Sequence, residues 1–121
     1  MPKTILVVDD EPDILKVITF RLKKLGYDAI AVPSGDEALR LVNEKTPDLI
    51  LLDYRLPDIN GLEVGRLIRS NDRLKSVPII LISAFGGDDI EEALKRAVVD
   101  EYVKKPFEPE KLIALVEKYM R

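Results

Sequence analysis

The amino-acid sequence predicts a doubly wound α/β fold, in which a five-stranded parallel sheet is covered by five helices. Short, continuous apolar runs alternate along the chain with longer segments whose apolar residues recur at helical spacing. Continuous apolar runs are typical of strands buried on both faces of a parallel sheet. Because crossovers between parallel strands are right-handed, the helices then cover both faces. The 121 residues suffice for one domain with a buried core.

Strand signals occur at regular intervals. Each is a short run rich in aliphatic and β-branched residues, bounded by proline, glycine or charged residues. Pro47 and Pro78 precede the third and fourth runs. The runs predict strands over residues 5–8, 28–32, 49–52, 79–82 and 101–103.

Helical segments follow the strands and have recognisable ends. Pro12 stands where the first turn of a helix tolerates proline, and Gly26 is suited to end that helix. Ser34 and Glu37 have the spacing of a capping box. Apolar periodicity predicts helices over residues 12–25, 34–42, 62–69, 90–97 and 109–120.

Composition narrows the classes of function. The net charge of −3 indicates no basic surface for nucleic acid. Cysteine and histidine are absent, so any metal must be held by oxygen, which favours a hard cation such as Mg²⁺. There is no signal-like leader and no apolar run of about 18 residues, so we expect a cytoplasmic protein that does not enter a membrane.

Four of the predicted strands end in groups that could act together. Asp9 and Asp10 follow the first strand, Asp53 the third, Ser83 the fourth and Lys105 the fifth. The carboxyl ends of parallel strands share one edge, where such folds bind ligands. Neighbouring carboxylates repel one another unless a cation lies among them, and Mg²⁺ suits oxygen ligands. Asp53 is the best nucleophile, because carboxylates form covalent phosphoryl intermediates. Lys105 and Ser83 would then contact the phosphoryl oxygens.

Each of these groups also has a simpler explanation. A carboxylate after a strand is often a turn residue or a helix cap. The Ser83 hydroxyl could bond only to nearby backbone, and Lys105 could be a solvated surface amine. Strand alternation turns the neighbouring Lys104 the other way, so it fits the surface role better. The coincidence of all these groups on strand ends favours the functional interpretation.

These segments together resemble the receiver domain of two-component response regulators, the family that includes the stand-alone chemotaxis regulator. The resemblance rests on ILVVDDEPD, PDLILLDYRLPDINGLEV, PIILISA and DEYVKKPF, which follow the family's order and spacing over essentially the whole chain. It implies a flavodoxin-like sheet with strand order 2-1-3-4-5 and a single receiver domain over residues 1–121.

The resemblance also implies roles for the strand-end residues. Asp53 matches the phosphoacceptor, which takes a phosphoryl group from a phosphohistidine on a partner protein. Asp10 matches a direct metal ligand and Asp9 an acid acting largely through water. The backbone carbonyl of Arg55 matches a third protein ligand to the metal ion, which is expected to be Mg²⁺, with Mn²⁺ as the alternative. Lys105 matches the amine that pairs with the phosphate.

A conformational switch is implied as well. Ser83 matches the switch hydroxyl, which would move toward the phosphate, and Tyr102 the aromatic residue that then turns inward. The Lys105-Pro106 bond matches a cis bond of the family. We therefore expect a phosphoacceptor switch that catalyses only its own phosphorylation and dephosphorylation.

Its partners would be a sensor histidine kinase or phosphotransfer protein and a downstream target or an output domain. Nucleic acid and membrane are not expected as direct partners, and the protein would be a monomer or a weak dimer. The sequence does not identify the kinase or the target.

The chain departs from the usual family pattern in three places. Val98-Val99 stands where the family commonly has Gly-Ala, so the fourth helix is expected to end differently, because a β-branched residue tolerates left-handed geometry badly. Arg55 and Phe85 lie two residues after Asp53 and Ser83, at positions that tune phosphoryl hydrolysis in the family. Their bulk predicts slow autodephosphorylation. The sequence ends after the fifth helix, so it shows no output domain.

Three alternatives stay open. An aspartate-nucleophile phosphatase of the haloacid dehalogenase type would want a second aspartate where Arg55 stands, and a cap domain. A flavodoxin-like cofactor binder would need a phosphate cradle after the first strand, but that loop is the acidic DDEPD. A receiver that folds but is never phosphorylated is the hardest rival, although all the active-site groups are present.

Overall fold

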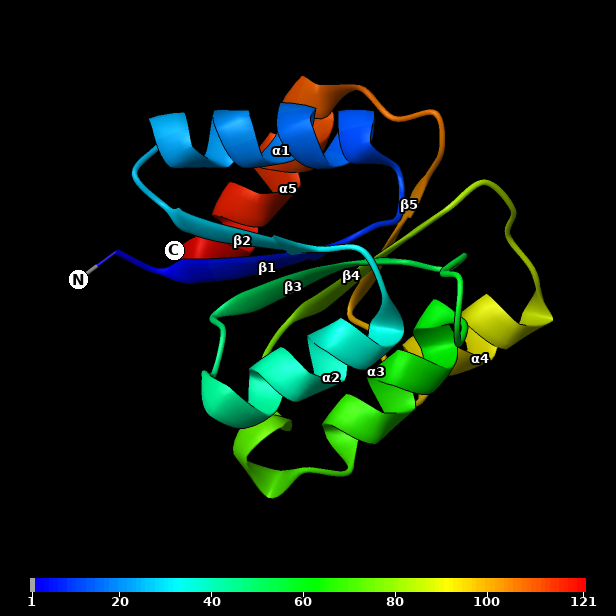
Figure 1. Cartoon of the computed structure of the whole chain (residues 1–121). Coiled ribbons are helices and arrows are strands. Elements are labelled where there is room, and N and C mark those ends of the chain that lie inside the picture. Colours follow the sequence, from blue (N-terminus) through cyan, green and yellow to red (C-terminus); the bar gives the residue numbers. More distant parts are fainter. Residues whose placement is uncertain (1) are drawn as a thin grey trace.

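The computed structural model describes residues 2–121, which form one sheet between two layers of helices (Figure 1). Within these residues the sheet has five parallel strands in the order β2-β1-β3-β4-β5, so the expected order is confirmed. The strands are β1 (Thr4–Val8), β2 (Asp28–Val32), β3 (Leu49–Asp53), β4 (Ile79–Ser83) and β5 (Glu101–Lys104). The helices are α1 (Pro12–Lys24), α2 (Gly35–Glu44), α3 (Gly61–Arg69), α4 (Asp88–Lys95) and α5 (Pro109–Met120). A short 3-10 helix at Asp72–Leu74 was not predicted.

Each face of the sheet buries its own apolar cluster. Successive strand side chains point to opposite faces, so Leu6 and Val8 of β1 pack toward α2, α3 and α4. Ile5 and Val7 pack toward α1 and α5. Figure 1 shows these two helical layers on opposite sides of the sheet. All residues of β1, β3 and β4 are buried, which confirms that the apolar runs mark strands covered on both faces.

The predicted helix ends are present. Pro12 lies in the first turn of α1, and Gly26 has a φ of 93° just beyond its end. The Ser34 hydroxyl accepts a hydrogen bond from the Glu37 backbone N–H at 3.2 Å and caps α2. Asp58 adds a cap that was not predicted, because its carboxylate accepts the Gly35 N–H at 3.0 Å. This contact ties the loop after β3 to the start of α2.

The end of α4 differs from the prediction. The helix stops at Lys95, and Ala97, predicted to be helical, has a left-handed φ of 57°. The Val98 N–H donates to the Ala93 carbonyl at 2.9 Å and the Ala97 N–H to the Leu94 carbonyl at 3.2 Å. These two bonds form a Schellman motif. The left-handed residue is therefore an alanine, and neither valine of the Val98-Val99 pair carries that strain.

Strands β3, β4 and β5 each extend one residue further than predicted. As a result, Asp53 and Ser83 are the last residues of their strands and not the first residues of loops. Their backbone positions are fixed by the sheet, since Tyr54 N–H donates to the Ile82 carbonyl at 2.8 Å directly after Asp53. Among residues 2–121, no helix is long and apolar enough to cross a bilayer.

Replacing Ala97 with glycine should stabilise the protein by about 1 kcal/mol, because glycine reaches a left-handed φ without the steric cost of a Cβ. Urea denaturation followed by circular dichroism measures the free energy of unfolding. Ala114→Gly, on the exposed side of α5, is the matched control and should destabilise by about 0.5–1 kcal/mol. Destabilisation by both substitutions would contradict the strain assigned to Ala97.

Candidate functional site

The predicted site residues meet at the carboxyl edge of the sheet. Asp53 and Ser83 end the neighbouring strands β3 and β4, and Lys105 follows β5, which pairs with β4. Asp9 follows β1 on the other side of β3. The side chains of Asp9, Asp53 and Ser83 are buried. A cavity of about 390 Å³ opens over this edge; its lining includes Asp10, Asp53, Arg55, Ser83 and Lys105.

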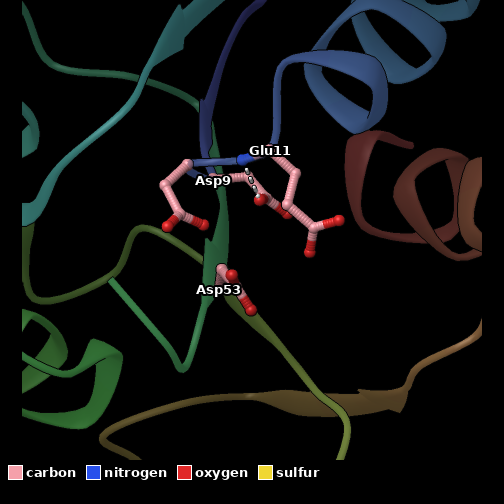
Figure 2. Close-up of side chains that lie close together, drawn as sticks. Asp9, Glu11 and Asp53 are labelled. Atoms are coloured by element: carbon pink, nitrogen blue, oxygen red, sulfur yellow. Dashed lines mark hydrogen bonds between the residues drawn. The ribbon is translucent and has the colours of Figure 1, made fainter. Parts of the chain in front are cut away.

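Four carboxylates gather here, as Figure 2 shows for three of them. One oxygen from each of Asp9, Asp10, Glu11 and Asp53 lies within 4.8 Å of the others. The Glu11 backbone N–H donates to Asp9 Oδ1 at 2.9 Å and holds that carboxylate in place. An all-oxygen donor set of this kind fits a hard divalent cation such as Mg²⁺.

Glu11 was not predicted as part of the site. In the sequence it stands only as one residue of the acidic loop DDEPD after the first strand. The signal available was the third consecutive acid at a strand end. Glu11 is in fact the N-terminal capping residue of α1, but its side chain makes no capping hydrogen bond, so its carboxylate can reach the site.

The Lys105 ammonium lies among three of these carboxylates. Its Nζ atom is 3.3 Å from Asp9 Oδ2, 3.1 Å from Glu11 Oε1 and 3.3 Å from Asp53 Oδ1. Burial alone would lower the pKa of Lys105, but the charges of Asp53 and Asp9 outweigh it and raise that pKa. Lys105 is thus the cation that compensates the buried acids, whereas Lys104 is exposed as expected.

Burial makes it unfavourable to ionise the carboxyl groups of Asp9 and Asp53. Burial and the charge of Asp9 together raise the pKa of Asp53 to about 6, against the opposing effect of Lys105. Burial also raises the pKa of Asp9, although the Glu11 N–H and Lys105 oppose this. A cation bound among these oxygens would lower both pKa values, since an opposite charge favours the ionised carboxylates.

Ser83 ends β4 directly before the loop that follows it, and Tyr102 of β5 lies close to Gly86 of that loop. The Ser83 hydroxyl donates to the Phe85 carbonyl at 2.7 Å and accepts the Phe85 N–H at 3.1 Å. The hydroxyl is therefore bonded to backbone, as its simpler explanation requires. Tyr102 is half-buried, and its hydroxyl is buried with no hydrogen-bond partner among residues 2–121. A Cβ added at Gly86 would lie 3.7 Å from this hydroxyl.

Two large side chains line the opening of the cavity. The Arg55 guanidinium carbon lies 5.8 Å from the centroid of the Phe85 ring, a cation–π geometry. Both side chains are exposed, and Phe85 retains 66% of its accessible area. They therefore line the same cavity as the buried Asp53 on its solvent-exposed part.

Nearby, the Lys105-Pro106 bond is cis, as the resemblance implies. The family model for the response regulator receiver domain matches residues 5–117 of this chain. The chain belongs to this family. Receiver domains act in two-component signalling by phosphorylation, as phosphoacceptor domains and generally not as enzymes of the usual kind. Phosphorylation and magnesium binding are general features of the family.

Its relatives differ in length. The chain is 33% identical over 120 residues to the polar-differentiation response regulator DivK of Brucella anthropi, across 99% of this chain and 98% of DivK. It is 38% identical over 122 residues to the DNA-binding response regulator MtrA of Mycolicibacterium smegmatis, across 100% of this chain and 52% of MtrA. It thus spans nearly all of one relative and about half of the other.

A solved relative contains a metal. The receiver domain of the sensor histidine kinase PA1611 from Pseudomonas aeruginosa superposes with a TM-score of 0.86 and 32% identity over 98% of each chain. That structure has a magnesium ion coordinated in its active-site cleft.

Without divalent cations, Asp53→Asn should gain stability over the wild type as the pH rises from about 4 to 7. The Asp53 carboxyl has a pKa of about 6 in the folded protein and an ordinary value of 3.8, so it binds more protons when folded between these values. Stability therefore falls as the pH rises through this window. A shift of about two pKa units corresponds to about 3 kcal/mol, which the neutral asparagine does not lose. Urea denaturation in EDTA at both pH values measures the difference.

Asp13→Asn is the control for this experiment, because Asp13 is exposed in the first turn of α1. Its stability difference from the wild type should not change with pH in the same way. Saturating Mg²⁺ should reduce the gain of Asp53→Asn at neutral pH, because the cation stabilises the wild-type carboxylate. If Asp53→Asn gained the same stability at both pH values, the raised pKa of the Asp53 carboxyl would be refuted.

Proposed function

We propose that this chain is a phosphorylation-dependent switch, in which Asp53 accepts a phosphoryl group from a histidine kinase or phosphotransfer protein with the help of Mg²⁺. The observation that carries the proposal is the buried Asp53 carboxylate at the sheet edge, 3.3 Å from the Lys105 ammonium and beside a cluster of acids. We further propose that residues 1–121 form a single receiver domain.

The chemistry follows from the positions of these groups. An Asp53 carboxylate oxygen attacks the phosphorus of a phosphohistidine and the phosphorus–nitrogen bond breaks. The imidazole nitrogen keeps the electron pair and takes a proton from solvent water. The product is an acyl phosphate on Asp53. Lys105 pairs with the phosphoryl oxygens, and Ser83, once released from Phe85, donates a hydrogen bond to them.

A cation would be held by this chain's own oxygens. Asp10, Asp53 and the Arg55 backbone carbonyl would be direct ligands, and Asp9 would act largely through water. Mg²⁺ suits this donor set, as would Mn²⁺. When bound, the cation neutralises charge on the phosphoryl oxygens. The magnesium in the cleft of the Pseudomonas aeruginosa relative supports this choice.

The output would run through Ser83 and Tyr102. Movement of the Ser83 hydroxyl toward the phosphate would open space for Tyr102 and shift the surface formed by α4, β5 and α5. That surface would bind a downstream target or an output domain. A haloacid dehalogenase-type phosphatase is disfavoured, because the exposed Arg55 replaces the acid such enzymes need two residues after the nucleophile.

Acetyl phosphate with Mg²⁺ should add one phosphoryl group to the protein, since a small donor needs only the nucleophile and its charge partners. Intact-protein mass spectrometry detects the adduct. Asp53→Asn and EDTA should each abolish it, while Asp48→Asn, at the opposite edge of the sheet, should leave it unchanged. An unmodified wild type would favour the alternative that the chain folds but is never phosphorylated.

The phosphoryl group should then be lost slowly, over much longer than minutes, because Arg55 and Phe85 crowd the path of attacking water. Arg55→Ala combined with Phe85→Ala should accelerate hydrolysis about tenfold, which corresponds to about 1.4 kcal/mol of activation free energy. The decay of the mass adduct after removal of acetyl phosphate gives the rate.

A matched control exists on α1, where Lys24 lies 5.0 Å from the exposed Phe20 ring in a second cation–π pair. Replacing both members of that pair with alanine should leave the hydrolysis rate unchanged. Loss of phosphate from the wild type within minutes would count against the crowding.

A further inference from the structure

The Lys105 ammonium already has three carboxylate partners before any phosphoryl group arrives: it donates hydrogen bonds to Asp9 and Glu11 and forms an ion pair with Asp53. An ammonium has three N–H donors. Three carboxylates lie within 3.3 Å of Nζ: Asp9, Glu11 and Asp53. Because the proposed function requires Lys105 to pair with a phosphoryl oxygen, that oxygen would compete with these carboxylates for the ammonium.

The three partners differ in how easily they can leave. The side chain of Asp9 is 2% exposed and that of Asp53 is 4% exposed, so neither can be hydrated in place of its ion pair. Asp9 is also held by the Glu11 backbone N–H. The Glu11 side chain is 59% exposed, and its carboxylate regains water when it leaves Lys105. Glu11 is thus the partner that leaves at the lowest cost in free energy.

The backbone at Glu11 is held by a hydrogen bond to Asp9, whereas its side chain is exposed and paired with Lys105. Glu11 caps the start of α1, and its N–H is bonded to Asp9, but its carboxylate makes no capping bond within the described residues. The ion pair with Lys105 joins residues 94 apart in sequence and crosses from the start of α1 to the end of β5. In Figure 2 the Glu11 carboxylate projects from the same loop as Asp9, and Asp53 lies opposite.

We propose that Glu11 is a positioning residue that holds Lys105 in the unphosphorylated site and is displaced from it by a phosphoryl group on Asp53. This inference rests on the proposed function. It gives Glu11 a role opposite to that of the other acids: Glu11 competes with the phosphoryl group for the ammonium, so its negative charge limits how tightly the modified state is held.

The test uses beryllofluoride, which mimics a phosphoryl group on a carboxylate, titrated at saturating Mg²⁺ and followed by calorimetry. Glu11→Gln should bind beryllofluoride about two- to fivefold more tightly than the wild type, the range expected for loss of a half-exposed ion pair. Asp13→Asn is the matched control. It removes an exposed carboxylate from the first turn of α1, in the groove beside Lys105, and should change the affinity less than twofold.

A double-variant cycle separates competition for Lys105 from a general effect of charge. In the Lys105→Met background, Glu11→Gln should no longer change the beryllofluoride affinity, because the ammonium is gone. An equal gain in both backgrounds would mean a general charge effect and would overturn the proposal. Weaker binding by Glu11→Gln would overturn it as well, since Glu11 would then support the modified state.

A titration with Mg²⁺ alone tests the remaining role of Glu11. The affinity of Glu11→Gln for Mg²⁺ should stay within about twofold of the wild type, as for a half-exposed charge that is not a ligand. A tenfold loss with unchanged beryllofluoride binding would identify Glu11 as a metal ligand and overturn the competition. If the wild type binds no beryllofluoride at all, the proposed function fails, and this inference fails with it.

Discussion

The carboxyl edge of this sheet depends on one ammonium group among buried acids. Asp9 and Asp53 are withdrawn from water at the ends of their strands, and the charge of Asp9 raises the free-energy cost of charging Asp53. Lys105 makes the arrangement tolerable, because a buried carboxylate without its partner costs about 3–5 kcal/mol. The parallel topology supplies this cation, since β5 delivers Lys105 two strands away from the β3 end that carries Asp53. Without a metal or a phosphoryl group, the site thus holds buried carboxylates that one ammonium only partly compensates. Binding of either group would change this charge balance.

The opposite edge of the sheet is fixed by a second cation. The Arg69 guanidinium donates to the Val77 carbonyl at 2.6 Å, to the Val98 carbonyl at 3.2 Å and to Asp100 at 2.8 Å. The same Asp100 carboxylate accepts the Ile79 N–H at 2.8 Å at the start of β4. Arg69 thereby anchors the starts of β4 and β5, while residues 84–89 at their far end are exposed. The end of these strands that Arg69 holds is thus opposite the end that carries Ser83 and Lys105.

Much of this could be predicted from sequence, and the exceptions share a physical cause. The apolar runs gave the strands because a doubly covered sheet leaves little choice of residue, and topology then brought Asp9, Asp53, Ser83 and Lys105 to one edge. Glu11 was missed because the sequence does not reveal whether the side chain of a residue at the start of a helix caps that helix or reaches Lys105. The end of α4 was misplaced because the left-handed turn at Ala97 is defined by backbone bonds to Ala93 and Leu94, which composition does not reveal.

The proposed switch has its physical basis in two unequal hydroxyl groups. The Ser83 hydroxyl is bonded to the Phe85 backbone, whereas the Tyr102 hydroxyl is buried beside Gly86 and has no hydrogen-bond partner within residues 2–121. A buried hydroxyl without a hydrogen bond costs about 1–3 kcal/mol. If Ser83 turned toward a phosphate, it would release the Phe85 backbone and free the intervening loop to offer Tyr102 an acceptor. Recovering that free energy would shift a two-state equilibrium by about five- to 150-fold, because about 1.4 kcal/mol corresponds to a factor of ten. A rearrangement of the loop that gave the Tyr102 hydroxyl a hydrogen-bond acceptor would therefore favour the rearranged state.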